Sequence, residues 1–140
     1  MLCVLAVLAI YSPLSDKHIP YFRSAVDVCE AVAMKADDLE VDDVLAVAVA
    51  SEESRFRRDV ESPSGAVGPL QIMPDYWCPK KGPCDSIESG VKALKYYLKK
   101  YEGDELKALQ GYAGSGPRAK RYARRVTARI RHLRNALEAL

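Results

Sequence analysis

The sequence contains no apolar run long enough to cross a bilayer. Its most apolar stretch, residues 1–10, is about half of the roughly 20 residues that a membrane-spanning helix needs. This stretch also lacks the positive n-region and the clear small-x-small cleavage site of a secretory signal peptide. We therefore expect no transmembrane segment and no cleavable leader, and we predict that residues 1–10 form a first core helix.

Histidines, internal repeats and flexible linkers are also scarce or absent. The two histidines, His18 and His132, lack the paired spacing of a structural zinc site, so we predict no metal and no cofactor. Since no Pro/Gly/Ser-rich linker divides the chain, residues 1–140 are expected to form a single domain. Apolar residues make up 49% of the sequence and charged residues 29%, which excludes a disordered chain and is typical of a globular protein.

Four cysteines are present, and they fall into two pairs of different character. Cys3 and Cys29 lie on expected helices, where we interpret them as small buried hydrophobic residues. Cys78 and Cys84 bracket a short Pro/Gly loop that could close as a disulfide. Connectivity cannot be read from a sequence, so a disulfide and free thiols remain equally open for this second pair.

The net charge is only +2, but the charged residues are unevenly placed. Residues 118–134 hold eight Lys or Arg residues and no acid, which leaves 13 basic and 19 acidic residues in the rest of the chain. The acids crowd between Asp27 and Glu53. We therefore predict that part of the basic segment pairs with acidic residues of neighbouring helices.

Helical patterns dominate the chain. The Ala- and Val-rich segment 24–37 is expected to be a helix, and Asp42 and Asp43 offer an N-cap to the next one. By periodicity alone, the apolar run 44–50 is compatible with either a buried strand or a buried helix, but the caps before it favour a helix. Two prolines and two glycines within residues 57–70 predict a loop or small hairpin that forms one wall of a cleft.

One acid lies where an apolar segment meets polar, irregular chain. The run 44–50 ends directly on Ser51-Glu52-Glu53, so a carboxyl group at this junction is partly desolvated and its pKa should rise. A glutamate that stays protonated near neutral pH can serve as a general acid. For Glu52 we favour an ordinary surface carboxylate at a helix end.

Two amphipathic helices are expected in the C-terminal half. Residues 85–88 resemble a capping box, and Gly90 in the helix that follows indicates a close helix crossing. The last helix places apolar residues, including Tyr122, on one face and arginines on the other. We predict that Tyr122 lies in the core or on the floor of the cleft rather than exposed, with a hydroxyl that can still reach the active site.

The residues after this acid form a long and specific pattern. The chain reads Glu-Ser-Arg-Phe at 53–56 and Ser-Pro-Ser-Gly-Ala-Val-Gly-Pro-Leu-Gln-Ile-Met-Pro at 62–74. In this register it resembles the catalytic core of the soluble lytic transglycosylases, relatives of goose-type lysozyme that cleave peptidoglycan glycan strands. A weaker similarity extends to the last helix. The resemblance implies a mainly α, lysozyme-like fold, in which a helical bundle surrounds a buried central helix that carries the catalytic glutamate, with a small loop or hairpin wall.

The resemblance also implies the residues of the site. Glu53 would be the catalytic acid/base, because only Glu53 is followed by Ser-x-aromatic. Tyr112, which we place in a glycine-rich turn after a helix, matches a family tyrosine whose hydroxyl approaches the glutamate. Two positions depart from the family pattern, Pro69-Leu70 where Leu-Met is usual and Ala113 where Asn is usual. The implied substrate-binding residues are Ser54, Ser62, Gln71, Met73, Tyr112 and Tyr122.

Most glycosidases use two carboxylates, but no second acid falls on a motif position in this chain. Asp59, Glu61 and Asp75 are near the motif in sequence only. With one acid, the resemblance implies a substrate-assisted cleavage of the MurNAc-GlcNAc β-1,4 bond, in which the C6 hydroxyl of the muramic acid closes a 1,6-anhydro ring without water. Water attack, as in a goose-type-like muramidase, is the alternative among enzymes.

A binding module for nucleic acid or another anionic surface is the alternative from a different class, since segment 118–134 is basic. Its arginines do not alternate with aromatic residues and its apolar stripe is that of a packed helix, so nucleic acid is a disfavoured partner. The intact Glu53-Ser54 pair argues against an inactive, structural relative. Peptidoglycan glycan strands are the expected substrate, and the basic helix is a candidate surface for a cell-wall or virion partner. We expect action in the periplasm or cell wall, reached by another export route or as a phage virion or lysis component.

Overall fold

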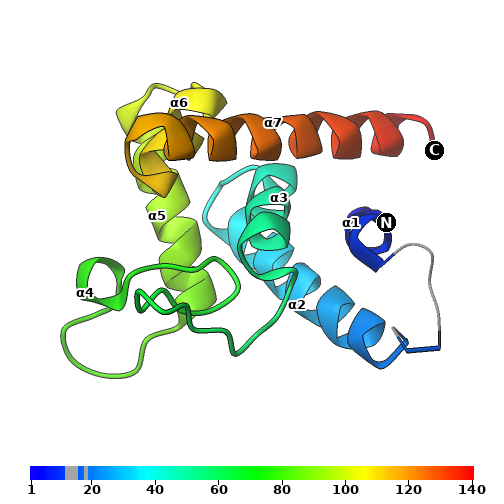
Figure 1. The fold of residues 1–140 in the computed structure, drawn as a ribbon, viewed down its shortest axis with the longest axis horizontal. Coiled ribbons are helices and arrows are strands. Elements are labelled where there is room, and N and C mark those ends of the chain that lie inside the picture. Colours follow the sequence, from blue (N-terminus) through cyan, green and yellow to red (C-terminus); the bar gives the residue numbers. More distant parts are fainter. Residues whose placement is uncertain (12–15, 18) are drawn as a thin grey trace.

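The computed structural model describes residues 1–11, 16–17 and 19–140, so His18 lies outside the described residues. Within this part the chain is mainly helical and has no strand (Figure 1), which confirms the predicted mainly α fold class. No described helix is both long and apolar enough to cross a membrane. The helices are α1 (Leu2–Tyr11), α2 (Ile19–Asp38), α3 (Asp43–Ser54), α4 (Pro74–Trp77), α5 (Ser86–Lys100), α6 (Glu105–Ala113) and α7 (Gly116–Glu138).

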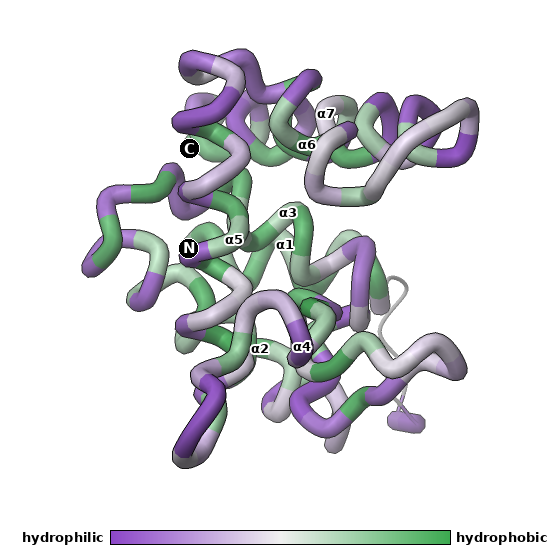
Figure 2. The backbone as a smooth tube through the Cα atoms, turned by 90° about the vertical axis from the view of Figure 1, so that its left-hand side faces the viewer, coloured by the Kyte–Doolittle hydropathy of each residue, from purple (hydrophilic) through white to green (hydrophobic). Residues whose placement is uncertain are grey.

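Helix α3 is the centre of the fold. Every residue from 44 to 51 is buried, and the helix packs against α1, α2 and α7. Figure 2 shows hydrophobic backbone segments in the middle of the molecule and hydrophilic ones on its outer turns. The Asp42 side chain caps α3 by accepting a 3.0 Å hydrogen bond from the Leu45 N–H. This cap and the alanines of the run explain why residues 44–50 form a helix rather than a strand.

Helix α1 confirms that the N-terminal apolar stretch is a core helix, since Cys3 and Val7 are buried against its neighbours. The interpretation of Cys3 and Cys29 as unpaired hydrophobic residues is wrong, because the two form a disulfide with their Cα atoms 5.6 Å apart. They are separated by 26 residues in sequence, and only the packing of α1 on α2 brings them within bonding distance. The sequence carried no local sign of that packing.

Of the three C-terminal helices, α7 packs against α3, while α5 and α6 pack against each other and α6 packs against α7. In Figure 1 α7 runs across the top of the view, in contact with α3 and α6, and α5 leads down from α6 toward α4. The cap predicted for α5 is present, because the Asp85 carboxylate accepts hydrogen bonds of 3.1 Å from the N–H groups of Ile87 and Glu88. Asp104 caps α6 in the same way, accepting from the Lys107 N–H at 3.0 Å.

Gly90 has a different role from the one predicted. The side chain of Leu70, from the loop after α3, rather than a helix, supplies the atoms nearest to this position. A Cβ atom at Gly90 would lie 2.5 Å from Leu70 Cδ1, closer than any side chain tolerates. The glycine therefore lets a loop residue that is fully buried dock against α5.

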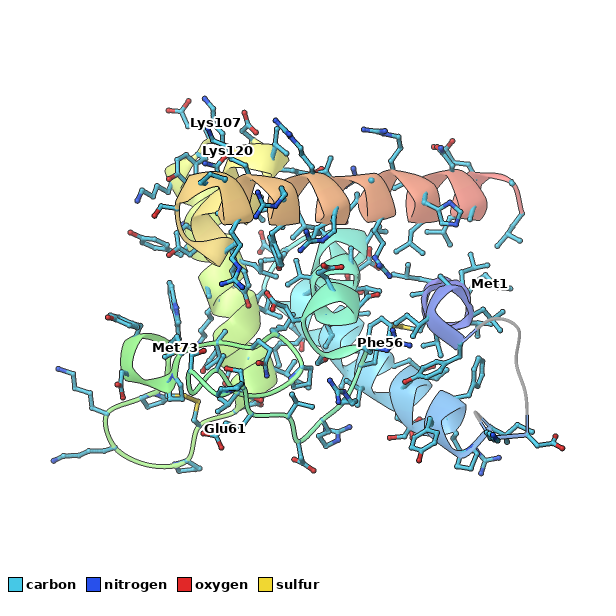
Figure 3. All side chains as sticks on the ribbon, viewed as in Figure 1. Met1, Phe56, Glu61, Met73, Lys107 and Lys120 are labelled. Atoms are coloured by element: carbon cyan, nitrogen blue, oxygen red, sulfur yellow. A yellow bond between two sulfur atoms is a disulfide. The ribbon has the colours of Figure 1, made fainter. Side chains whose placement is uncertain are left out.

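Part of the basic segment pairs with acidic residues, as predicted. Arg134 on α7 contacts Asp42 at 3.1 Å and Glu105 at 3.0 Å, which ties the last helix to the starts of α3 and α6. Other cations of the segment face outward: Lys120 is exposed, and in the view of Figure 3 it lies on the upper side of α7. Pairing therefore leaves only part of the positive charge free at the surface.

Residues 55–73 link α3 to α4 as the predicted loop with a small hairpin. Two isolated antiparallel bridges, Glu61 with Val67 and Val67 with Ile72, fold the loop back on itself. After α4, Cys78 and Cys84 form a disulfide with Cα atoms 5.3 Å apart, so the pair that the sequence left open is bonded. The loop and this closed segment lie below α7 in Figure 1.

Candidate active site

A cleft of about 580 Å³ lies beside the C-terminal end of α3. Its walls come from α3, the loop 55–73 and helices α4 to α7. Figure 3 shows Met73 on the loop side, near α4. The residues that line the cleft are Glu53, Ser62, Ser64, Ala66, Gln71, Ile72, Met73, Trp77, Tyr97, Tyr112, Ala113, Arg118, Ala119, Tyr122 and Arg125. The structure thus gathers six of the seven predicted site residues in one place.

The backbone conformation at the C-terminal end of α3 fixes the position of Glu53. The next residues, Arg55 and Phe56, have positive φ angles of 54° and 60°. This left-handed conformation costs roughly 1–2 kcal/mol for each residue other than glycine. The Arg55 N–H still bonds to the Ser51 carbonyl at 3.1 Å, and Phe56 is fully buried. The left-handed residues turn the chain sharply after α3, and the burial of the Phe56 side chain compensates the cost of this backbone strain.

The Glu53 carboxyl has the environment of a general acid. Its pKa is raised from 4.5 to about 7, mainly by burial, and the negative charge of Glu52 contributes to the rise. A hydrogen bond of 2.8 Å from the Tyr122 hydroxyl to Glu53 Oε2 acts in the opposite direction, because it stabilises the charged form. The balance leaves about half of the Glu53 side chains protonated near neutral pH.

Glu52, the adjacent acid, has a different environment. Its carboxylate contacts Arg125 Nε at 2.8 Å and Arg129 Nη2 at 3.6 Å. Arg129 also donates to the Ser51 hydroxyl at 2.6 Å. Because both arginines belong to α7, these contacts make Glu52 an anchor of α7 on α3.

Tyr112 lies in the cleft but does not donate to the glutamate. Its hydroxyl donates to the carbonyl of Leu70, while Tyr122 takes the place beside Glu53 that the resemblance assigned to Tyr112. Burial and the charge of Glu53 together raise the pKa of Tyr112, so the two side chains are still electrostatic neighbours. Tyr112 also belongs to the last turn of α6 rather than to a turn after it, because α6 continues through Ala113.

The loop wall of the cleft is held by its own side chains. The Gln71 amide donates to the carbonyls of Val60 and Gly68, both at 3.0 Å, and its backbone adopts a left-handed φ of 50°. The Ser62 hydroxyl accepts from the Ala66 N–H at 3.0 Å. Both predicted residues therefore shape the loop, and both also line the cleft.

Ser54 is the predicted site residue that the cleft does not include. It is fully buried, and its hydroxyl donates to the Ala50 carbonyl at 3.1 Å. Its own carbonyl accepts from Arg57 Nε at 2.9 Å. This position does not fit a substrate contact, so we assign Ser54 instead to stabilising the end of α3.

Glu53 is the only carboxylate among the described residues that line the cleft. Asp59, Glu61 and Asp75 are exposed and lie outside this lining. Figure 3 shows Glu61 at the lower edge of the loop, far from α7. A second acid close to Glu53, which an ordinary glycosidase would need, is thus missing from the lining.

The lining residues that were not singled out from the sequence include two aromatic and two cationic side chains, Trp77, Tyr97, Arg118 and Arg125. The prediction that the arginines of the last helix lie opposite Tyr122 is wrong for Arg125, because Arg118, Tyr122 and Arg125 are spaced by four and three residues and share one face of α7. Trp77 and Tyr97 had no readable signal in the sequence, since their meeting depends on how α4 packs against α5.

The chain was compared with known families and structures. A sequence model of the family described as Transglycosylase SLT domain matches residues 30–134, from α2 to near the end of α7. The matched segment covers most of the chain and includes every residue that lines the cleft. No solved structure matches the chain.

Proposed function

The chain belongs to the transglycosylase SLT domain family, whose members are peptidoglycan lytic transglycosylases, and we propose that Glu53 carries out this reaction as the single acid and base. The observation that carries the proposal is the environment of Glu53: it is the one carboxylate of the described lining, and burial raises its pKa to about 7. A carboxyl group with that pKa can both donate and accept a proton near neutral pH.

The proposed first step breaks the bond between N-acetylmuramic acid and N-acetylglucosamine. Glu53 donates its proton to the glycosidic oxygen, and the C–O bond breaks to leave a free 4-hydroxyl on the N-acetylglucosamine. The carbonyl oxygen of the muramic N-acetyl group bonds to C1 and holds the positive charge that develops there. No protein nucleophile is required, which agrees with a lining that offers no second carboxylate.

In the proposed second step Glu53 acts as the base. Its carboxylate takes the proton of the muramic C6 hydroxyl, whose oxygen attacks C1 and displaces the acetamido oxygen. The product ends in a 1,6-anhydro ring, Glu53 regains its proton, and no water is consumed. Tyr122 supports both steps, because its hydrogen bond stabilises the carboxylate between them.

We propose that the substrate contacts come from Ser62, Gln71, Met73, Tyr112 and Tyr122, all of which line the cleft. A nucleic-acid binding function has less support, since Arg125, Arg129 and Arg134 are paired with acids of the same chain. The substrate is cell-wall peptidoglycan. We infer action in the periplasm or as a phage virion or lysis component, with the exposed cations of α7 facing a cell-wall or virion partner.

Digestion of insoluble peptidoglycan by matched variants tests the role of Glu53. The amide of Glu53→Gln keeps the size of the side chain but has no acid proton to donate, so we expect the rate to fall by roughly 10²–10⁴-fold. Glu52→Gln is the control one residue away, and we expect a loss below about tenfold because its role is to anchor α7. If the two variants behaved in the opposite order, Glu52 would be the acid.

A further inference from the structure

An aromatic cluster forms the wall of the cleft at α4 and α5. The ring of Trp77 lies 6.0 Å from that of Tyr97 and 5.6 Å from that of Tyr96, measured between ring centroids. The Tyr96 and Tyr97 rings are 5.1 Å apart in an edge-to-face arrangement, a favourable geometry for aromatic pairs. Trp77 and Tyr97 line the cleft, and Tyr96 supports Trp77 from outside it.

A row of aromatic rings links this cluster to the acid. Burial and the charge of Glu53 raise the pKa of Tyr112, so Tyr112 is a neighbour of the acid, as Tyr122 is. The ring centroid of Tyr112 lies 6.3 Å from that of Tyr97, which in turn lies 6.0 Å from that of Trp77. A sugar that contacts Trp77 would therefore lie beyond the sugar that contacts Tyr112, and Trp77 would bind the strand without taking part in the chemistry.

The backbone that carries Trp77 is held by several contacts. The Trp77 backbone N–H bonds to the Met73 carbonyl at 3.2 Å, and the Cys78 N–H bonds to the Pro74 carbonyl at 3.0 Å. The Cys78–Cys84 disulfide closes the segment that follows directly. Trp77 is half-buried against the rings of Tyr96 and Tyr97 and lines the cleft, so a large aromatic side chain is held at the cleft wall and remains open to a ligand.

We propose that Trp77 is a stacking platform for a sugar ring of the glycan strand, in a subsite remote from the scissile bond. The apolar C–H face of a pyranose ring complements the electron-rich face of an indole, and a preorganised ring loses little conformational entropy when a ligand binds. This inference rests on the proposed function, since it takes the glycan strand as the ligand. Its consequence is a preference for long strands over short ones.

Tryptophan fluorescence tests the platform directly, because Trp77 is the only tryptophan of the chain. Glu53→Gln protein, which binds without cleaving, is titrated with peptide-free glycan strands of a long and a short length, while calorimetry follows binding independently. We expect long strands to change the emission of Trp77 and to bind more tightly than short ones. Strands that bind by calorimetry without any change in emission would overturn the proposal and leave the proposed function intact.

Steady-state kinetics of Trp77 variants give a second, independent test. Removal of an aromatic anchor by Trp77→Ala should raise KM for long strands by about tenfold, with kcat nearly unchanged, and Trp77→Phe should recover most of the loss. Tyr76→Ala is the control, since Tyr76 is 80% exposed on the same short helix and does not line the cleft. If Trp77→Ala protein has normal thermal stability and an unchanged KM, the platform proposal is overturned. If the wild-type protein cleaves no strand at all, the result counts against the proposed function instead.

Discussion

The hydroxyl of Tyr122 donates a 2.8 Å hydrogen bond to the carboxylate of Glu53, across 69 residues of sequence. This bond joins the buried helix α3 to the basic helix α7 at the floor of the cleft. The same hydrogen bond lowers the pKa of Glu53, whereas burial raises it. The resulting pKa of about 7 is therefore lower than burial alone would produce. Tyr122 is thus placed to tune the acid as well as to pack beside it.

Removal of this hydroxyl should change the pH profile of the enzyme. A hydrogen bond to the carboxylate lowers the pKa of Glu53, so Tyr122→Phe should raise that pKa and move the alkaline limb of kcat/KM to higher pH. Rates on soluble glycan strands between pH 5 and 9 would measure the shift. Tyr21→Phe, at an exposed position on α2, is the control and should leave the profile unchanged. A limb that moved to lower pH would show that the bond stabilises the protonated form instead.

The Tyr112 hydroxyl has a structural partner, so its loss should affect stability as well as turnover. Tyr112→Phe leaves the buried Leu70 carbonyl without its donor, which typically costs about 1–3 kcal/mol of unfolding free energy. Turnover should fall too, because Gln71 and Met73 follow Leu70 on the same wall of the cleft. Urea denaturation and rates measured on the same preparation would test both effects. If the variant kept its full stability but had reduced turnover, the Tyr112 hydroxyl would bond to the substrate rather than to the Leu70 carbonyl.

Replacement of Gly90 by alanine should destabilise the protein, although most glycine-to-alanine changes inside a helix stabilise it. Alanine normally stabilises a helix interior by about 1 kcal/mol over glycine. At Gly90 the new methyl group would meet Leu70 at 2.5 Å, and such overpacking costs about 1–3 kcal/mol, so we expect Gly90→Ala to lower the urea midpoint. A higher midpoint would mean that the loop docks elsewhere in solution.

The sequence predicted those features that depend on local chemistry. The cap at Asp42 and the helix that follows it depend on residues close together in the chain, and both are present. The raised pKa of Glu53 is also present, since the apolar run before it predicted a partly desolvated carboxyl group. Residues 57–70 were likewise correctly predicted to be a loop or small hairpin, since their prolines and glycines exclude a helix.

The features that the sequence missed depend on packing between distant elements. The Cys3–Cys29 disulfide requires α1 to lie on α2, and the contact of Gly90 with Leu70 requires the loop to reach α5. The sequence did predict that the Tyr122 hydroxyl can reach the active site, but which tyrosine hydroxyl bonds to the Glu53 carboxylate is decided by how α6 and α7 are placed relative to α3. No local pattern encodes these distances.

Mass spectrometry of the products of peptidoglycan digestion tests the central claim most directly. If Glu53 is the only acid and base, the muramic C6 hydroxyl is the nucleophile, and the wild-type protein should release fragments that end in 1,6-anhydro-N-acetylmuramic acid without new reducing ends. Products with mainly reducing ends would show that water attacks instead, and would contradict the single-carboxylate mechanism while leaving Glu53 as the acid.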